Sequence, residues 1–285
     1  MIEITTPGKG RIEVGKDRFP DGTTMLLSLD EKEELSLAYV IMIRWAYENE
    51  NELIRLMYVS KHFHDLYPDK SQILYMPYVP NARMDRVKRN CEVFTLKWFA
   101  EIINSLDFKA VYILDPHSNV TPALINRVNV APMDEVFAEI GRTNEFDTVY
   151  FPDESAMKRY REHFSGKNII YGKKTRDWET GKILGVQVCG EADKADNVLV
   201  VDDIISKGGS VYYGLEALTK AHEPKNIMVY ATHVEDSIYM GDLFRKYIGT
   251  GKAKLITTDS VVRQDKMFID QYKFNLQVIG TKIYC

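Results

Sequence analysis

The feature that most constrains the fold of this 285-residue chain is a repeated alternation of short apolar, β-branched runs with segments of helical hydrophobic period. Such alternation is typical of α/β proteins, in which helices cross between neighbouring strands of a largely parallel sheet. The runs predict strands at residues 73–76, 111–114, 148–151, 169–171, 198–201, 227–231 and 255–257. The strands fall into two groups, so we expect two α/β domains, residues 1–135 and 136–285, each a mainly parallel sheet flanked by helices.

Two apolar stripes with helical spacing lie between the expected strands. The first comprises Leu35, Ala38, Tyr39, Met42 and Trp45, and the second comprises Phe94, Trp98, Ile102 and Leu106. We expect both stripes to be the core-facing sides of helices, without a direct role in function.

Composition excludes several classes of function. The chain is 45% hydrophobic and 27% charged, as expected of a globular protein with a buried core. Its three cysteines indicate a reducing compartment, and its N-terminus has no apolar signal segment, so we expect a cytoplasmic protein. The longest apolar stretch, residues 35–43, is too short to span a membrane. A net charge of −4 argues against nucleic-acid binding, so an anionic ligand would need local clusters of positive charge.

The strongest local signal is VLVVDDIISKGGSV, residues 198–211. Four apolar residues predict a buried strand, Asp202 and Asp203 follow it, and a glycine-rich turn then leads into a helix. Ligands of open α/β sheets bind beyond the carboxyl ends of the strands, and backbone N–H groups at a helix N-terminus attract phosphate. The two carboxylates suit either vicinal sugar hydroxyls or a hydrated cation. The string lacks the spacing of a Walker A loop.

This string resembles the ribose 5-phosphate loop of the type I phosphoribosyltransferase fold. The resemblance implies that Asp202 and Asp203 hold the ribose 2- and 3-hydroxyls. It also implies a 5-phosphate site formed by the loop residues Ser206, Lys207, Gly208, Gly209 and Ser210. Both domains are therefore expected to be phosphoribosyltransferase-like.

Further segments resemble the ribose-phosphate pyrophosphokinases, or PRPP synthetases. These segments are FPDG (19–22), PYVPNARMDR (77–86), LDPHS (114–118), FPDESAMKR (151–159) and YGKKTRD (171–177). They occur in the order found in that family. An ETG turn at residues 179–181 further suggests a hairpin that closes over the site.

The resemblance implies a role for each matching residue. Those expected to contact ATP are Phe19, Asp21, Arg83, Asp85 and Arg86, with Phe19 and Asp21 reaching the ATP of a neighbouring subunit in a homo-oligomer. His117 would bind magnesium–ATP and Asp153 would contribute to a metal or ribose site. Lys174 and Arg176 would be the catalytic pair. The implied reaction is attack of the anomeric hydroxyl of ribose on the β-phosphorus of ATP, with AMP leaving and Mg²⁺ as cofactor.

The chain departs from the family at informative positions. Met84 replaces a glutamine, Thr23 a glutamate and Cys91 an arginine. The family loop D-T-A-G-T reads Ser-Lys-Gly-Gly-Ser at residues 206–210, which removes a carboxylate and adds a lysine. This loop should accept more negative charge and bulk, so two acceptors remain open. They are ribose 5-phosphate, giving PRPP, and ADP-ribose, giving its pyrophosphate in a pathway of NAD resynthesis.

Two other classes of function remain as alternatives. A phosphoribosyltransferase that consumes PRPP would share residues 198–211 but would not need the ATP-side segments or the catalytic pair. A regulatory paralogue without activity would bind nucleotide, but it would have no reason to keep Lys174, Arg176, His117 and Asp153.

Overall fold

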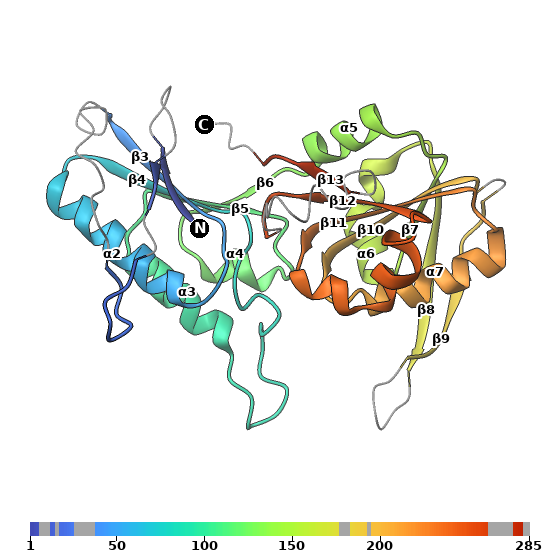
Figure 1. The fold of residues 1–285 in the computed structure, drawn as a ribbon, viewed down its shortest axis with the longest axis horizontal. Coiled ribbons are helices and arrows are strands. Elements are labelled where there is room, and N and C mark those ends of the chain that lie inside the picture. Colours follow the sequence, from blue (N-terminus) through green and yellow to red (C-terminus); the bar gives the residue numbers. More distant parts are fainter. Residues whose placement is uncertain are drawn as a thin grey trace. The chain divides into compact units, whose positions relative to one another are not determined.

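The computed structural model describes residues 1–5, 12–14, 17–25, 38–176, 183–192, 195–261 and 276–281. The chain divides into two compact units, with the boundary between Pro132 and Met133. The sequence places the boundary three residues later, between positions 135 and 136. Each unit is a mainly parallel sheet flanked by helices (Figure 1), which confirms the α/β fold class. None of the helices in the described part of the chain is long and apolar enough to cross a membrane.

Unit 1 contains a six-stranded sheet in the order β2-β1-β3-β4-β5-β6. Its strands are β1 (Ile2–Thr5), β2 (Ile12–Glu13), β3 (Val40–Trp45), β4 (Ser71–Met76), β5 (Ala110–Leu114) and β6 (Val128–Ala131), and its helices are α2 (Asn51–Leu66), α3 (Thr95–Ser105) and α4 (Val120–Leu124). Strands β3 to β6 are parallel, whereas β1 is antiparallel to both β2 and β3. The carboxyl ends of β3 to β6 therefore share one edge of the sheet.

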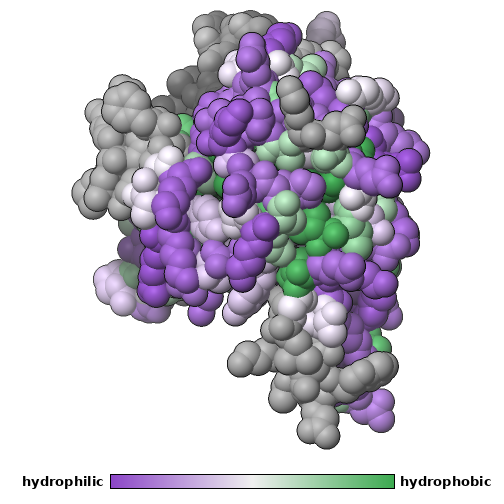
Figure 2. Space-filling view, turned by 90° about the vertical axis from the view of Figure 1, so that its right-hand side faces the viewer, coloured by the Kyte–Doolittle hydropathy of each residue, from purple (hydrophilic) through white to green (hydrophobic). Residues whose placement is uncertain are grey.

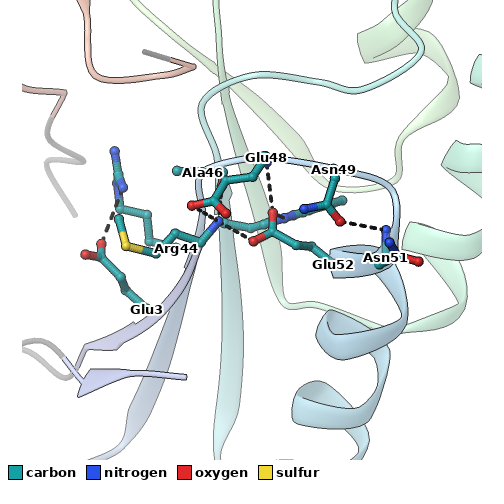
Figure 3. Close-up of polar contacts among 9 residues, drawn as sticks. Glu3, Arg44, Ala46, Glu48, Asn49, Asn51 and Glu52 are labelled. Atoms are coloured by element: carbon teal, nitrogen blue, oxygen red, sulfur yellow. Dashed lines mark hydrogen bonds and ion pairs between the residues drawn. The ribbon is translucent and has the colours of Figure 1, made fainter. Parts of the chain in front are cut away.

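A polar cluster ties the first strand of unit 1 to the start of α2 (Figure 3). The Glu52 carboxylate is almost fully buried and accepts hydrogen bonds from the Trp45 indole at 3.0 Å, from the Glu48 amide at 2.9 Å and from the α-amino group of Met1. Because a buried carboxylate is stable only when it is well paired, this cluster fixes the end of β3 against the helix.

Unit 2 contains a seven-stranded sheet in the order β13-β12-β11-β10-β7-β8-β9, in which only β9 is antiparallel to its neighbour. The strands are β7 (Thr148–Phe151), β8 (Asn168–Arg176), β9 (Ile183–Cys189), β10 (Asn197–Ile205), β11 (Asn226–Val234), β12 (Ala253–Thr258) and β13 (Leu276–Ile279). The helical elements are α5 (Asp134–Thr143), α6 (Glu154–Tyr160), η1 (Arg161–Phe164), α7 (Gly209–His222), η2 (Asp236–Met240) and η3 (Phe244–Ile248).

The two faces of the unit 2 sheet have different cores. Leu215 and Leu218 of α7 are fully buried in a cluster with alternate residues of β10 and β11, such as Val229. Phe137 of α5 packs against Tyr230, the next residue of β11, with ring centroids 5.5 Å apart. Since successive strand residues point to opposite faces, α7 and α5 cover opposite sides of the sheet. On the face of unit 2 turned toward the viewer in Figure 2, hydrophilic side chains surround a smaller hydrophobic patch.

All seven predicted strands are present, as β4, β5, β7, β8, β10, β11 and β12. The first predicted helix was wrong, because residues 40–45 form β3 in the centre of a sheet. The alternate residues Ile41, Ile43 and Trp45 are fully buried, and their β-branched character favours a strand. Leu35 of the same stripe lies outside the described residues.

The second predicted helix is present as α3, and its predicted core face is correct only in part, since Leu106 is fully buried and Phe94 packs against the core but Trp98 does not. Leu96, Phe99 and Ile103 are buried, whereas Trp98 is 52% exposed and lies under the Lys97 ammonium at 4.8 Å from its ring centroid. The apolar spacing included Trp98 in the core face, although this large aromatic residue lies on the solvent side of the helix.

Candidate active site

The acidic pair lies inside β10 rather than after it. The strand continues to Ile205 because Ile204 and Ile205 pair with His233 and Val234 of β11. The Asp203 side chain is buried, and its Oδ2 accepts a hydrogen bond from Arg159 Nη1 at 3.0 Å. The Asp203 amide donates to Asp202 Oδ1 at 3.0 Å. Burial raises the pKa of Asp202 well above its ordinary value, and the negative charges of Asp203 and Asp153 add to this effect.

Asp153 and Lys174 form an ion pair beside these carboxylates. Asp153 caps the N-terminus of α6, where its Oδ1 accepts from the Ala156 amide at 3.0 Å. Its Oδ2 accepts from Lys174 Nζ at 2.8 Å. The Lys174 side chain is only 7% exposed, whereas that of Asp153 is 38% exposed. Burial acts to raise the pKa of Asp153, but hydrogen bonds from Lys174 and from backbone amides outweigh it and hold the pKa below its ordinary value.

Helix α6 brings a further residue to the site. Asp153 stands at its N-terminus and Arg159 lies in its last turn, so one short helix connects the Lys174 ion pair with the Asp203 ion pair. Sequence analysis gave Arg159 no role, although it ends the FPDESAMKR segment. The position of Arg159, six residues after Asp153, was the only signal for such a role in the sequence. Its partner Asp203 lies 44 residues away in the chain, so the pairing itself was not visible there.

The predicted phosphate loop forms a turn at the N-terminus of α7. Gly208 precedes the helix with φ of +74°, a left-handed conformation that glycine adopts without strain, and its carbonyl accepts from the Tyr212 amide at 2.8 Å. Lys207 and Gly209 are exposed, and a Cβ on Gly209 would meet no atom within 4 Å. The first N–H groups of this 14-residue helix therefore face an open surface that suits an anion.

Unit 1 holds a second charged cluster, around Asp85. Arg86 donates two hydrogen bonds to its carboxylate, from Nε at 2.7 Å and from Nη2 at 2.8 Å, and Ser118 Oγ donates a third at 2.6 Å. The Arg86 hydrogen bonds, reinforced by Ser118, hold the pKa of Asp85 well below its usual range despite burial. His117 and Arg83 are exposed. Ser118 lies in the LDPHS segment, but no role was predicted for it.

Phe19 and Asp21 lie in a small exposed turn. Gly22 has φ of +85°, and the Asp21 carboxylate accepts from the Thr23 amide at 2.9 Å and from the Thr23 hydroxyl at 2.7 Å. Both hydrogen bonds lower the pKa of Asp21, and the bond from the Thr23 amide has the larger effect. The Phe19 ring is 50% exposed. Thr23, which replaces the family glutamate, thus holds the neighbouring aspartate.

Some predicted site residues lie in different units or outside the described residues. His117 belongs to unit 1 and Asp153 to unit 2. Arg176 is the last residue of β8, but its side chain and the turn predicted at 179–181 lie outside the described residues. Within the described residues, no group of three or more His, Cys, Asp or Glu side chains is arranged to hold a metal ion.

Comparison with known proteins gives one consistent result. No family model matches the chain. The ribose-phosphate pyrophosphokinase of Sulfurisphaera tokodaii is 23% identical over 248 residues, which cover 85% of this chain and 82% of that protein. That of Thermococcus kodakarensis is 27% identical over 238 residues, 81% of each chain. This chain is similar to the ribose-phosphate pyrophosphokinases.

The fold agrees with that similarity. The crystal structure of phosphoribosylpyrophosphate synthetase from Mycobacterium smegmatis superposes with a TM-score of 0.71 at 16% identity, and covers 94% of this chain and 86% of that protein. The resemblance to ribose-phosphate pyrophosphokinases inferred from short segments is therefore confirmed, as is the α/β fold expected from it.

Proposed function

We propose that the chain is an ATP-dependent pyrophosphokinase that transfers the β,γ-pyrophosphate of ATP to the anomeric hydroxyl of a 5-phosphorylated ribose and releases AMP. The observation that carries the proposal is the arrangement at one edge of unit 2. An acidic pair on β10 is followed directly by an open, glycine-containing helix N-terminus, and the Lys174 ion pair stands beside it. The relatives are named for this activity.

In this proposal the unit 2 residues bind and orient the acceptor. Asp202 and Asp203 accept hydrogen bonds from the ribose 2- and 3-hydroxyls, and Arg159 fixes the orientation of Asp203. The α7 N-terminus and the hydroxyls of Ser206 and Ser210 hold the 5-phosphate. Sugar hydroxyls and phosphate are thereby fixed at two points, which leaves the anomeric hydroxyl in a defined position for attack.

Lys174 has the position and charge to stabilise the transferring group. In the transition state the Lys174 ammonium would break its hydrogen bond to Asp153 and donate to the phosphoryl oxygens, on which negative charge develops. Arg176 is the second cation assigned to this role. On the donor side, Arg83 and Arg86 bind the ATP phosphates, with Asp85 and Ser118 orienting Arg86. Phe19 and Asp21 of a neighbouring copy complete the ATP site in a homo-oligomer, which light scattering would test.

Magnesium fits the donor atoms present. It prefers oxygen ligands, keeps several waters and is bound mainly through substrate phosphates, so one or two carboxylates suffice. Asp153, together with His117 acting through the magnesium–ATP complex, would hold it, and it would neutralise charge on the transferring phosphates. Turnover should be lost on chelation and restored by Mg²⁺.

Two acceptors fit the proposal, and one observation favours the larger one. Gly209 is exposed and a Cβ on it would meet no atom within 4 Å, and Lys207, in the same loop, is also exposed. A 5-phosphate that carries a further nucleotide, as in ADP-ribose, would therefore have steric room at this loop, and its additional phosphate could pair with the Lys207 ammonium. Ribose 5-phosphate needs neither feature. A role in NAD resynthesis would follow only from the ADP-ribose activity.

The decisive assay is AMP release from ATP and Mg²⁺ with ribose 5-phosphate, with ADP-ribose, and with no acceptor. AMP release with either acceptor, and little without one, is the expected result and also identifies the acceptor. Folded protein that releases no AMP would refute the proposal and favour a PRPP-consuming transferase or a regulatory paralogue. Lys174→Ala should abolish AMP release and leave ATP binding intact. A regulatory paralogue would instead bind ATP and release no AMP both before and after the substitution.

A further inference from the structure

The segment Gly241–Tyr247, which we call the support segment, lies directly against the phosphate loop. A side chain at Gly241 would overlap the carbonyl oxygen of Lys207. In the opposite direction, a Cβ on Gly208 would lie 2.6 Å from Cδ2 and 2.8 Å from Cβ of Leu243, which is fully buried. Each chain segment thus leaves no room for any residue but glycine in the other. The backbone path of residues 207–208 is therefore fixed from this side.

Two side-chain contacts extend the same interface along α7. Lys246 Nζ donates to the Tyr212 hydroxyl and lies 4.7 Å from the centre of its ring. One turn further, the Tyr247 hydroxyl donates to Glu216 Oε1 at 2.8 Å. Since Tyr212 and Glu216 are one helical turn apart, both contacts hold the same side of α7, next to the loop.

The support segment has an unusual backbone at this point. Residues Phe244–Ile248 form one turn of π-helix, in which the Gly249 amide donates to the Phe244 carbonyl at 2.8 Å. Single π turns are rare and occur often at functional sites. Here the turn allows the consecutive residues Lys246 and Tyr247 both to reach α7.

The other side of the loop is open, as the surroundings of Gly209 show. The loop is therefore packed rigidly on one side and exposed on the side where an anion would bind. A phosphate site needs this asymmetry, because N–H groups attract an anion strongly only when they already converge on it.

We propose that the support segment positions the loop for the 5-phosphate of the acceptor, with Gly241 and Leu243 as positioning residues. The inference rests on the proposed function for the identity of the ligand, but not for the geometry. It predicts that a disturbance of the support segment changes the binding of the ribose phosphate while ATP binding stays unchanged.

The first test measures loop order without any substrate. Gly241→Ala should speed amide hydrogen exchange in a peptide covering residues 206–212 by about tenfold or more, since the loop would be displaced, and should leave exchange in β7 unchanged. Gly141→Ala is the matched control, because a Cβ at Gly141 in α5 meets no atom within 4 Å. Unchanged exchange at 206–212 in folded Gly241→Ala protein would overturn the inference, whatever the activity of the enzyme.

The second test measures function. In the AMP-release assay, Gly241→Ala should raise KM for the ribose phosphate by up to about 10²-fold, the usual effect of misplacing a binding group by 1 Å, with KM for ATP unchanged. Equal effects on both substrates would contradict a positioning role. If the wild-type protein releases no AMP, the proposed function fails, and the exchange measurement still decides whether the segment positions the loop.

A milder variant covers the case in which Gly241→Ala does not fold. Lys246→Met removes the hydrogen bond and the cation–ring contact to Tyr212 without a backbone clash, and should raise both loop exchange and KM for the ribose phosphate by about 2- to 10-fold, the equivalent of one hydrogen bond. Lys220→Met, at an exposed position near the end of α7, is its control. No difference between these two variants would refute the proposal.

Discussion

Breaking the Lys174–Asp153 ion pair from its two sides should cost very different amounts of stability. Asp153→Asn leaves an ammonium group whose side chain is 7% exposed, whereas Lys174→Met leaves a carboxylate that is 38% exposed and still accepts from the Ala156 amide. A buried charge without its partner costs about 3–5 kcal/mol, but a half-exposed carboxylate can be hydrated, so its loss of pairing costs about 0–1 kcal/mol. Asparagine remains a good N-cap, so the α6 cap does not confuse the comparison.

These free energies convert into measurable shifts. For a unit of this size about 1 kcal/mol shifts Tm by roughly 2–4 °C, so Asp153→Asn should lower the Tm of unit 2 by roughly 6–20 °C and Lys174→Met by less than about 4 °C. Differential scanning calorimetry of the full chain at pH 7 measures both, and the double variant should resemble Lys174→Met. Equal losses, or a larger loss for Lys174→Met, would refute the assignment of Lys174 as the buried partner.

The pH dependence of the same pair has a defined sign. The folded state holds the pKa of Asp153 below its ordinary value of 3.8, so the ionised carboxylate stabilises the fold. This stabilisation is fully present above the unfolded-state pKa and is lost as pH falls through the lower folded-state pKa. The difference in Tm between wild type and Asp153→Asn should therefore stay constant from pH 5 to pH 8 and shrink below about pH 4.

Three further substitutions test the surroundings of Arg159, Tyr150 and Ser118. Arg159→Gln should raise KM for the ribose phosphate about tenfold in steady-state kinetics, because Asp203 loses a charged hydrogen bond. Arg159→Lys keeps the charge and should have a smaller effect. An unchanged KM would contradict the role of Arg159 in orienting Asp203. Tyr150→Phe should stabilise the protein by about 1 kcal/mol in urea unfolding, since its buried hydroxyl has no hydrogen-bond partner in the described structure; a loss of stability would mean that it has one. Ser118→Ala should raise the pKa of Asp85, as followed by carbon NMR of its carboxyl group, and weaken ATP binding by about 2- to 10-fold; an unshifted pKa would exclude the hydrogen bond.

The sequence predicted those parts of the fold and site that are local in the chain. Residues 198–211 indicated strand, carboxylates, glycine turn and helix together, and the structure has all four, with the carboxylates inside the strand rather than after it. The strand was predicted to end four residues too early, because its last residues are held by pairing with β11 and not by their own pattern. The central strand β3 was missed because its apolar residues also fit a helical spacing.

Contacts between distant segments were not predictable from the sequence. The Arg159–Asp203 bond joins residues 44 positions apart, and the close fit of Gly241 to the Lys207 carbonyl joins two turns that share no motif. A glycine in a loop rarely indicates a requirement by itself, since turns use glycine for many reasons. In the folded protein, the neighbouring Lys207 backbone requires a glycine at position 241, whereas no atom lies close enough to require one at position 209.

The charge arrangement itself has a consequence for how ligands bind. In the structure, Asp85 is held by Arg86, Asp153 by Lys174 and Asp203 by Arg159, so two of the predicted cations, and Arg159 with them, are already paired with carboxylates within the protein. An incoming phosphate must therefore compete with a carboxylate for each cation. When a phosphate draws Lys174 away, it leaves a carboxylate that favours a new positive charge, and binding of a divalent cation should become tighter. Because coupling free energies are reciprocal, the cation must strengthen phosphate binding by the same factor. The ion pairs thus make simultaneous binding of phosphate and cation more favourable than binding of either one alone.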